Sequence, residues 1–435
     1  MRHGPDRRLD AARRLLTHLW ETLRPGVPVR LWNGEVVPPE AVPAGGVMLA
    51  LNSPEAVTRL VRRPRLATVI ELVADGDLSI EGGTLLDLAA RRGALQRRGL
   101  ARRLDKRLVL GALLPFLFRG RAGAAGSHAY AGVDAAKDAR GRDNKALVQF
   151  HYDLSNAFYG LFLDPEMVYS CAYFPDWDAS LDDAQRAKLE MTCRKLRLRP
   201  GERFLDIGCG WGGLVCHAAQ HFGVLAHGVT LSQAQLDFAR EKVARLGLQD
   251  RVMLELKDYK DLSGEYDKIA SIGMFEHVGL DNHAAYFATM RRLLRPRGLL
   301  LNHAIARPAK KDLRTFRRKR PEFAALTRYV FPGGELDYIG LSLTNLERHG
   351  FEVHDVEGWR EHYGRTCRLW TERLYARREA AEEEVGAART RLWLLYLAGC
   401  ALAFERGSVG IFQTLSSKRA RGPSGLPPTR GDLYR

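Results

Sequence analysis

The sequence predicts an α/β protein in which a doubly wound, Rossmann-like sheet follows a smaller α+β N-terminal domain. Over residues 146–417, apolar strand-like runs alternate with helical stretches, which is typical of a parallel sheet covered by helices on both faces. A glycine-rich turn follows the first of these strands. A segment rich in Gly, Ala, Asp and Arg separates this region from residues 1–120.

Residues 1–120 are expected to form the N-terminal domain. An amphipathic helix is predicted over 9–24, short strands within 27–37 and 45–52, and further helices up to residue 92. Basic residues exceed acidic ones here and several occur as Arg pairs. A solvated basic face accounts for these pairs as well as an anionic partner does.

The remaining boundaries follow from composition. Residues 121–145 are predicted to be a flexible linker because Gly, Ala and charged residues dominate them. Residues 146–417 would form the catalytic domain. The basic stretch 418–435, with its Pro and Gly residues, is predicted to be a disordered tail.

Five parallel strands are predicted in the larger domain. They lie at 203–208, 224–231, 252–258, 266–273 and 298–306. Ligands in such sheets bind outside the carboxyl ends of the strands. The polar residues that end these strands are therefore expected to converge on one site.

Composition limits the partners and the compartment. The net charge of +16 and a pI near 9.7 favour nucleic acid, acidic substrates or an anionic membrane. The six cysteines form no CxxC pair, which argues against a zinc site and a disulfide framework and fits a reducing cytoplasm. The longest apolar run, 392–404, has 13 residues and cannot span a bilayer of about 30 Å. Any membrane contact is expected to be peripheral.

The glycine turn FLDIGCGWGGL favours S-adenosylmethionine over a dinucleotide. The GxGxxG spacing alone occurs in the binding sites of several nucleotide cofactors. A dinucleotide site also needs an acidic residue roughly 20 positions further on, and none occurs between Trp211 and Leu236. Asp206 stands two residues before the first glycine. A turn that only permits close packing of helix and strand is the alternative.

The apolar stretch KIASIGMFEHVG ends in Glu276 and His277 side by side. A buried carboxylate is costly unless it is paired or used for chemistry. Glu276 is therefore a candidate catalytic residue. The alternatives are that it pairs with His277 or caps the next helix.

Eight motifs in order resemble the cyclopropane-fatty-acyl-phospholipid synthase family, which includes the mycolic acid cyclopropane synthases. They are HYDLSNAFYGLFLDPEMVYSCAYF, FLDIGCGWGGL, GVTLSQAQ, SIGMFEHVG, NHAIA, YVFPGG, HYGRTCRLW and YLAGCALAFERG. The stretch ADGDLSIEGG at 74–83 resembles the N-terminal extension of the branch that acts on phospholipids. The resemblance implies the fold of S-adenosylmethionine-dependent methyltransferases.

The resemblance also implies an activity. Such an enzyme transfers a methylene from S-adenosylmethionine to the cis double bond of unsaturated phospholipid acyl chains, through a carbocation that bound bicarbonate deprotonates. Alternatives are a methyl- or methylene-branched lipid product, a small-molecule acceptor, or a catalytically silent lipid-binding scaffold.

Site residues follow from the same resemblance. The bicarbonate ligands would be Cys171, Glu276, His303, Ile305 and Tyr363. Read without the family, His303, Tyr363 and Cys171 are equally consistent with ordinary buried residues. Cys400 matches a cysteine that the family carries, but its neighbours offer no activating base, so packing near the acyl chain is its alternative role.

The cofactor contacts implied by the resemblance come from four segments. Two residues would contact the methionine end, the glycine turn and the second strand would surround the ribose, and one tyrosine would lie beside the adenine. They are Tyr169, Ser170, Asp206, Gly208, Cys209, Gly210, Thr230, Gln235 and Tyr259. Lys260 departs from the aromatic-acidic pair of the mycolic branch.

The stretch 307–323 is rich in Arg and Lys. It is either a solvated loop or a surface that meets lipid phosphates. Because the chain has no nucleic-acid motif, we expect an unsaturated phospholipid in an anionic membrane as partner. The expected location is cytoplasmic, peripherally associated with the inner face of the membrane, with a homodimer as a possible assembly.

Overall fold

The chain folds into two compact units. The computed structural model describes residues 6–39, 46–91, 104–117, 154–318, 321 and 328–434. The first unit contains the described residues up to 117 together with 321, 328–330 and 374–399, and the second contains 154–318, 331–373 and 400–434. The predicted linker, 121–145, lies outside the described residues.

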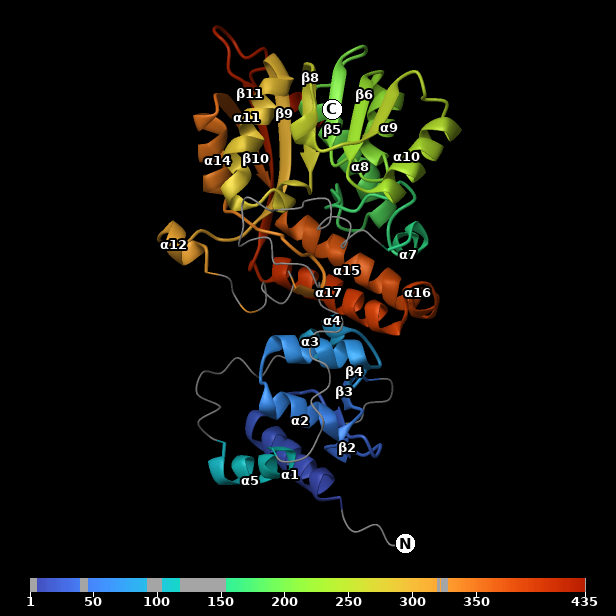
Figure 1. The fold of residues 1–435 in the computed structure, drawn as a ribbon, viewed down its shortest axis with the longest axis vertical. Coiled ribbons are helices and arrows are strands. Elements are labelled where there is room, and N and C mark those ends of the chain that lie inside the picture. The colour runs from blue at the N-terminus through green and yellow to red at the C-terminus, as the bar shows by residue number, and fades with distance from the viewer. Residues whose placement is uncertain are drawn as a thin grey trace. The chain divides into compact units, whose positions relative to one another are not determined.

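The first unit is a small α+β domain with a four-stranded sheet (Figure 1). In sheet order its strands are β2 (Val36–Val37), β1 (Val29–Arg30), β3 (Met48–Leu51) and β4 (Leu78–Glu81). Its helices are α1 (Arg7–Leu23), α2 (Pro54–Arg62), α3 (Leu66–Asp75), α4 (Leu85–Arg91), α5 (Lys106–Leu117), α16 (Arg378–Val385) and the first part of α17 (Ala387–Glu405).

Two segments distant in sequence join this unit through polar contacts. Arg391 of α17 donates to the carbonyl oxygens of Val73, at 2.9 Å, and Ala74, at 2.6 Å. These carbonyls belong to the last turn of α3, where the Gly76 amide also donates to the Val73 carbonyl at 3.2 Å. The Tyr329 hydroxyl donates to Glu71 Oε1 at 2.6 Å. The first unit therefore includes more than the N-terminal 120 residues.

The second unit is built on a seven-stranded sheet (Figure 1). In sheet order the strands are β10 (Phe351–Gly358), β11 (Gly410–Lys418), β9 (Leu294–Ala306), β8 (Tyr266–Ile272), β5 (Arg203–Ile207), β6 (Leu225–Thr230) and β7 (Val252–Leu256). The run from β9 to β7 is parallel. The predicted doubly wound α/β fold is confirmed.

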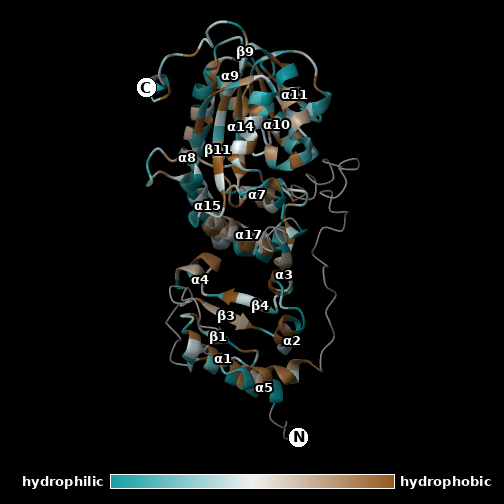
Figure 2. Cartoon of the chain, turned by 90° about the vertical axis from the view of Figure 1, so that its left-hand side faces the viewer, coloured by the Kyte–Doolittle hydropathy of each residue, from teal (hydrophilic) through white to brown (hydrophobic). Residues whose placement is uncertain are grey.

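Two hydrophobic clusters hold helices on opposite faces of this sheet. One cluster unites the sheet with α8 (Leu181–Leu196), α9 (Gly213–Phe222) and α10 (Gln233–Arg245). The other includes α11 (His283–Leu293) and α14 (Ile339–Arg348). Figure 2 shows hydrophobic colours along the strands between helices with hydrophilic outer turns.

Two strands were not predicted from the sequence. β11 lies antiparallel between β9 and β10 and places Gln413 directly opposite His303. Its sequence, GIFQTLSSK, follows a long helix rather than a turn–helix repeat, so the βαβ pattern does not reveal it. Helix α15 (Arg360–Ala376) follows β10 and covers the end of the sheet near the site.

The expectation of a disordered tail is corrected for residues 419–434. Leu433 is buried, Asp432 pairs with Arg197 at 2.9 Å, and Arg430 pairs with Asp355 at 2.6 Å. The composition of the tail suggested disorder, but one apolar residue and two ion pairs hold it on the second unit.

No helix among the described residues is both long and apolar enough to cross a bilayer.

The packed C-terminal segment can be tested by a matched pair of substitutions. Leu433→Ala should lower the free energy of unfolding by about 2 kcal/mol, because it removes a buried side chain. Tyr434→Ala, at the neighbouring exposed position, should change it by less than about 0.5 kcal/mol. Urea denaturation measures both, and equal effects would show that the segment does not pack.

Candidate active site

The glycine turn joins β5 to α9 at the carboxyl edge of the sheet. Gly208 and Gly210 have φ values of 79° and 55°, a region that residues with a Cβ seldom adopt. A Cβ on Gly208 would also lie 3.2 Å from the Met274 side chain. The turn therefore brings bare backbone to the edge of a pocket, directly before the N-terminus of α9.

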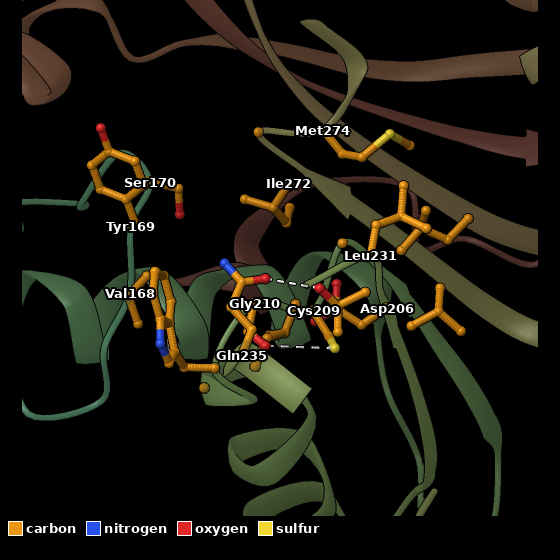
Figure 3. A pocket seen from close by; sticks show the side chains of 18 of the residues that line it. Val168, Tyr169, Ser170, Asp206, Cys209, Gly210, Leu231, Gln235, Ile272 and Met274 are labelled. Atoms are coloured by element: carbon orange, nitrogen blue, oxygen red, sulfur yellow. Dashed lines mark hydrogen bonds between the residues drawn. The ribbon is translucent and has the colours of Figure 1, made fainter. Parts of the chain in front are cut away.

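One pocket collects all nine residues that the sequence proposed as cofactor contacts. They are Tyr169, Ser170, Asp206, Gly208, Cys209, Gly210, Thr230, Gln235 and Tyr259. Figure 3 shows Tyr169 and Ser170 on one side, Leu231 and Met274 on the other, and Gln235 near Gly210. Thr230 Oγ1 donates to Gln235 Oε1 at 2.8 Å. This bond fixes the two polar side chains that follow β6.

Lys188 lines the same pocket and was missed by the sequence analysis. It is buried in α8, and its Nζ donates to Ser170 Oγ at 3.0 Å. Burial lowers the pKa of Lys188 to about 8 and raises the pKa of Asp206 to about 7, while the charge of each opposes the shift of the other. The pocket thus contains an acid and an amine that both titrate near neutral pH.

A helical pattern could have revealed Lys188. Gln185, Lys188, Thr192 and Lys195 recur at spacings of three and four residues, which places them on one side of α8. All four are buried. Gln185 donates from Nε2 to the carbonyl oxygens of Val168, at 3.2 Å, and Ser170, at 2.9 Å. A polar stripe on the buried side of a helix indicates a site rather than a core.

Two other pocket residues were also missed. Trp211 lies within the glycine motif, and its Nε1 donates to Asn156 Oδ1 at 2.7 Å. Asp258 lies at the end of β7, directly before Tyr259, and caps the short helix that follows. Both residues belong to motifs that the sequence predicted to lie near strand ends, and this position could have identified them as pocket residues.

Glu276 lies beyond β8 and is tied to the next strand of the sheet. Its Oε1 accepts a hydrogen bond from the Ile305 amide at 2.7 Å. Its buried Oε2 has no hydrogen-bond partner within the described chain. Burial raises the pKa of Glu276 to about 7, and the Ile305 hydrogen bond opposes that shift. The carboxyl group bonds to Ile305, whereas the His277 ring packs against Phe331 with centroids 4.4 Å apart.

His303 lies two residues before Ile305 on β9 and is 1% exposed. Its Nδ1 is 3.2 Å from Gln413 Nε2 on the neighbouring strand. Nε2 has no hydrogen-bond partner among the described residues. Burial lowers the pKa of His303 well below its usual value, and the charges of Lys188 and Lys195 add to this effect. The imidazole is therefore neutral at neutral pH.

Tyr363, which is half-buried, and Cys171 complete a cluster with Glu276, Ile305 and His303. Burial raises the pKa of Tyr363 well above its usual range, and nearby Cys171 and Glu276 contribute to the shift. Cys171 is fully buried, and its thiol donates to the Ala172 carbonyl at 3.2 Å. Burial raises the pKa of Cys171 well above its usual value, so the group remains a neutral thiol.

Cys400 is the remaining candidate catalytic residue. It lies on α17 and interacts electrostatically with Cys367 of α15. Cys367 is a buried thiol whose pKa is raised by burial, and Cys171 acts on it as well. Within the described residues no group of His, Cys, Asp and Glu has the arrangement of a metal site.

The cluster adjoins the cofactor pocket through two short segments. Ser170 lines the pocket and Cys171 follows it, while Gly273 and Met274 line the pocket just before Glu276. The Gly273 amide donates to the His303 carbonyl at 2.9 Å. A bound cofactor and the buried polar atoms of the cluster would therefore be neighbours.

The chain is similar in sequence to proteins that are named as fatty acid methyltransferases and cyclopropane synthases. It is 45% identical over 298 residues to a probable fatty acid methyltransferase of Pseudomonas putida, covering 68% of this chain and 75% of that protein. It is 39% identical over 268 residues to the cyclopropane-fatty-acyl-phospholipid synthase of Escherichia coli K12, covering 62% and 66%. A probable fatty acid methyltransferase of Mycobacterium tuberculosis is 40% identical over 66% of each chain.

Solved structures agree with these sequence relatives. The cyclopropane synthase MmaA2 from Mycobacterium tuberculosis superposes with a TM-score of 0.60 at 33% identity, covering 63% of this chain and 98% of that one. The mycolic acid cyclopropane synthase CmaA1, complexed with SAH and CTAB, gives a TM-score of 0.59 at 34% identity with the same coverage.

The profile of the mycolic acid cyclopropane synthetase family matches residues 139–414. The resemblance inferred from the eight motifs is thereby confirmed. With its S-adenosylmethionine-dependent methyltransferase fold, the chain belongs to the mycolic acid cyclopropane synthetase family.

Proposed function

We propose that this protein converts the cis double bond of an unsaturated phospholipid acyl chain to a cyclopropane, using S-adenosylmethionine as the one-carbon donor. The observation that carries the proposal is the buried pair of unpartnered atoms, Glu276 Oε2 and His303 Nε2, beside the cofactor pocket. The relative from Escherichia coli, named for this reaction, supports the choice of substrate.

The pocket residues fit S-adenosylmethionine by their chemistry. The cofactor supplies an electrophilic methyl group when it is bound. Gly208 and Gly210 allow the backbone to approach a ligand closely, as no residue with a Cβ would. Thr230 and Gln235 offer hydrogen-bonding groups to a ribose, and the Tyr259 ring, 6% exposed, offers a flat apolar face to an adenine.

The cluster fits a small anion that bears a proton, such as bicarbonate. Bicarbonate supplies a base for the proton that leaves when the ring closes. Neutral His303 can donate from Nε2, and Tyr363, with its raised pKa, keeps a hydroxyl proton to donate. Glu276 Oε2 can share a proton with the ligand, because the pKa of this carboxyl is about 7. The remaining lining is buried, which keeps water from a passing carbocation.

The chain's own residues then have separate tasks. The glycine turn and Gln235 orient the donor, and the backbone from 273 to 276 holds the cluster beside it. Glu276, fixed by Ile305, and His303 hold the base in place. The neutral thiol of Cys171 is not an activated nucleophile, so no covalent step on this cysteine is proposed.

A second candidate product is a methyl-branched or methylene-branched fatty acyl chain. The names of the relatives from Pseudomonas putida and Mycobacterium tuberculosis, both probable fatty acid methyltransferases, favour it. The same cation would then lose a different proton and keep a carbon–carbon double bond. A small-molecule acceptor is a third outcome of the same test.

We further propose that the enzyme works from the cytoplasmic side on an anionic membrane surface. Lys310, Lys311, Arg314 and Arg318 are exposed beside α12 (Leu313–Phe316), where Leu313 is 44% exposed. By contrast, Arg307 donates to the Phe316 carbonyl and Arg317 pairs with Asp281 at 2.6 Å. Some basic residues of this stretch therefore make contacts within the protein, whereas others are exposed and could contact lipid phosphates.

The reaction is tested with methyl-labelled S-adenosylmethionine, bicarbonate and anionic vesicles of mono-unsaturated phospholipid. Acyl chains that gain one CH₂ and show high-field cyclopropane protons by NMR are the expected products. The same mass gain with vinyl protons would establish the second candidate. Unlabelled lipid would contradict the proposal, provided that the cofactor is shown to bind.

Removing the charge of Glu276 should change how stability depends on pH. The folded-state pKa of about 7 exceeds the usual 4.5, so between these values the native protein keeps a proton that the unfolded chain has lost. Wild-type stability therefore falls as pH rises from 4.5 to 7. Glu276→Gln should gain up to about 3 kcal/mol relative to wild type across this window.

Urea denaturation at pH 4.5 to 8 in bicarbonate-free buffer measures this difference. The contributions of the other buried carboxyl groups to the pH dependence cancel in the difference, because both proteins contain these groups. Parallel pH profiles for the two proteins would contradict a raised pKa at Glu276. In the lipid assay the same variant should lose at least about 100-fold in rate.

Neutralising two exposed lysines should weaken membrane binding. Each basic residue near an anionic surface contributes about 1 kcal/mol, so Lys310→Gln with Lys311→Gln should lower vesicle affinity about 30-fold at low salt. Arg199→Gln with Arg251→Gln, two exposed positions near the opposite edge of the sheet, serves as the charge-matched control. Vesicle co-sedimentation measures the affinity of both variants. An equal loss of affinity in the control would contradict a specific role for Lys310 and Lys311, because net charge alone would then explain the effect.

A further inference from the structure

A chain of buried hydrogen bonds reaches His303 from the side remote from Glu276. Lys195 Nζ donates to Gln413 Oε1 at 2.7 Å, and Gln413 Nε2 lies 3.2 Å from His303 Nδ1. Lys195 also pairs with Glu357 of β10. Lys195, Gln413 and His303 are each 1% exposed, so water does not compete for these bonds.

The chemistry of the donors fixes the direction of every bond in this chain. A lysine ammonium has donors and no acceptor, so the Gln413 oxygen must face Lys195. The amide nitrogen of Gln413 must then face His303, and it can only donate. His303 Nδ1 is therefore the acceptor, and in a neutral imidazole the proton must lie on Nε2.

We propose that Lys195 and Gln413 are positioning residues that hold His303 in its Nε2–H tautomer, so that His303 serves the reaction as a hydrogen-bond donor and not as the proton acceptor. This inference rests on the proposed function for the reaction, but its statement about the tautomer does not. The unpartnered Nε2 of His303 is the atom that would present this proton to the anion.

The fold holds each member of the chain in place. Gln413 is paired with His303 in the register of β11 and β9. Lys195 comes from the polar stripe of α8 and lies 5.1 Å from the centre of the Trp359 ring, which in turn packs edge-on against His303 with centroids 5.1 Å apart. Glu357 balances the lysine charge in the buried setting.

The arrangement also keeps His303 from becoming cationic. Lys188 and Lys195 are the charged groups that act on its ring, and both disfavour a second proton. A His303 that already carries its proton on Nε2 could accept a second proton only on Nδ1, where Gln413 donates, and would then be an imidazolium beside two lysines. The proton released at ring closure must therefore go to a different group of the site.

The test is the tautomer of His303 in the full-length protein labelled with ¹⁵N-histidine. Long-range ¹H–¹⁵N NMR distinguishes a protonated from an unprotonated ring nitrogen, and His303→Asn assigns the signals. Wild type should show a protonated Nε2 and an unprotonated Nδ1 at neutral pH. Gln413→Glu, whose carboxylate can only accept, should protonate Nδ1. Lys195→Met should give a mixture, because the amide can then turn over.

Lys268→Met is the matched control. Lys268 is a half-buried lysine whose Nζ lies 3.7 Å from Glu202, near the opposite end of β8. It should leave the His303 spectrum and the rate unchanged. Gln413→Glu should lower kcat about 10- to 100-fold with a KM for S-adenosylmethionine within about twofold of wild type.

The outcomes separate this inference from the proposed function. A wild-type protein with Nδ1 protonated, or a Gln413→Glu protein with the wild-type tautomer, would overturn the inference even if cyclopropane lipid forms. The predicted tautomers without lipid product would leave the positioning chain intact and refute the proposed reaction instead.

Discussion

The hydrogen bond from the Ile305 amide to Glu276 is the contact on which the active-site cluster depends. It joins the segment after β8 to β9 and leaves one carboxyl oxygen buried without a partner. An unpaired buried polar atom destabilises a protein by roughly 1–3 kcal/mol. The cluster retains two such atoms, on Glu276 and His303, and so keeps binding capacity for a ligand at the expense of stability.

The parallel sheet explains why this cluster lies beside the cofactor pocket. The carboxyl ends of β5, β6 and β7 supply the donor pocket, while those of β8 and β9 supply the cluster. Since all five strands run in one direction, their ends meet at one edge. The chain runs from the cofactor pocket to the cluster within one to three residues, as from Ser170 to Cys171. The base would therefore lie close to the methyl group that the donor transfers.

Local patterns in the sequence predicted the parallel strands, whereas the family resemblance supplied the nine pocket residues, of which Tyr169 and Ser170 lie at no strand end. The ordering of the tail, β10 and β11, and the residues 374–399 of the first unit depend on contacts between distant segments. Lys188 and Lys195 recur at helical spacing with other polar residues of α8, but only packing against the sheet shows that this polar side of the helix is buried. Gln413 acquires its partner only from the register of β11 with β9, which no local pattern encodes.

A crystal structure of the protein with S-adenosylhomocysteine and bicarbonate would test the central claim most directly. The account predicts the cofactor product in the pocket lined by Asp206, Gly208 and Gln235, and a planar anion within hydrogen-bonding distance of both Glu276 Oε2 and His303 Nε2. A cluster closed by a rearranged side chain, with those two atoms bonded to protein and no anion between them, would contradict it.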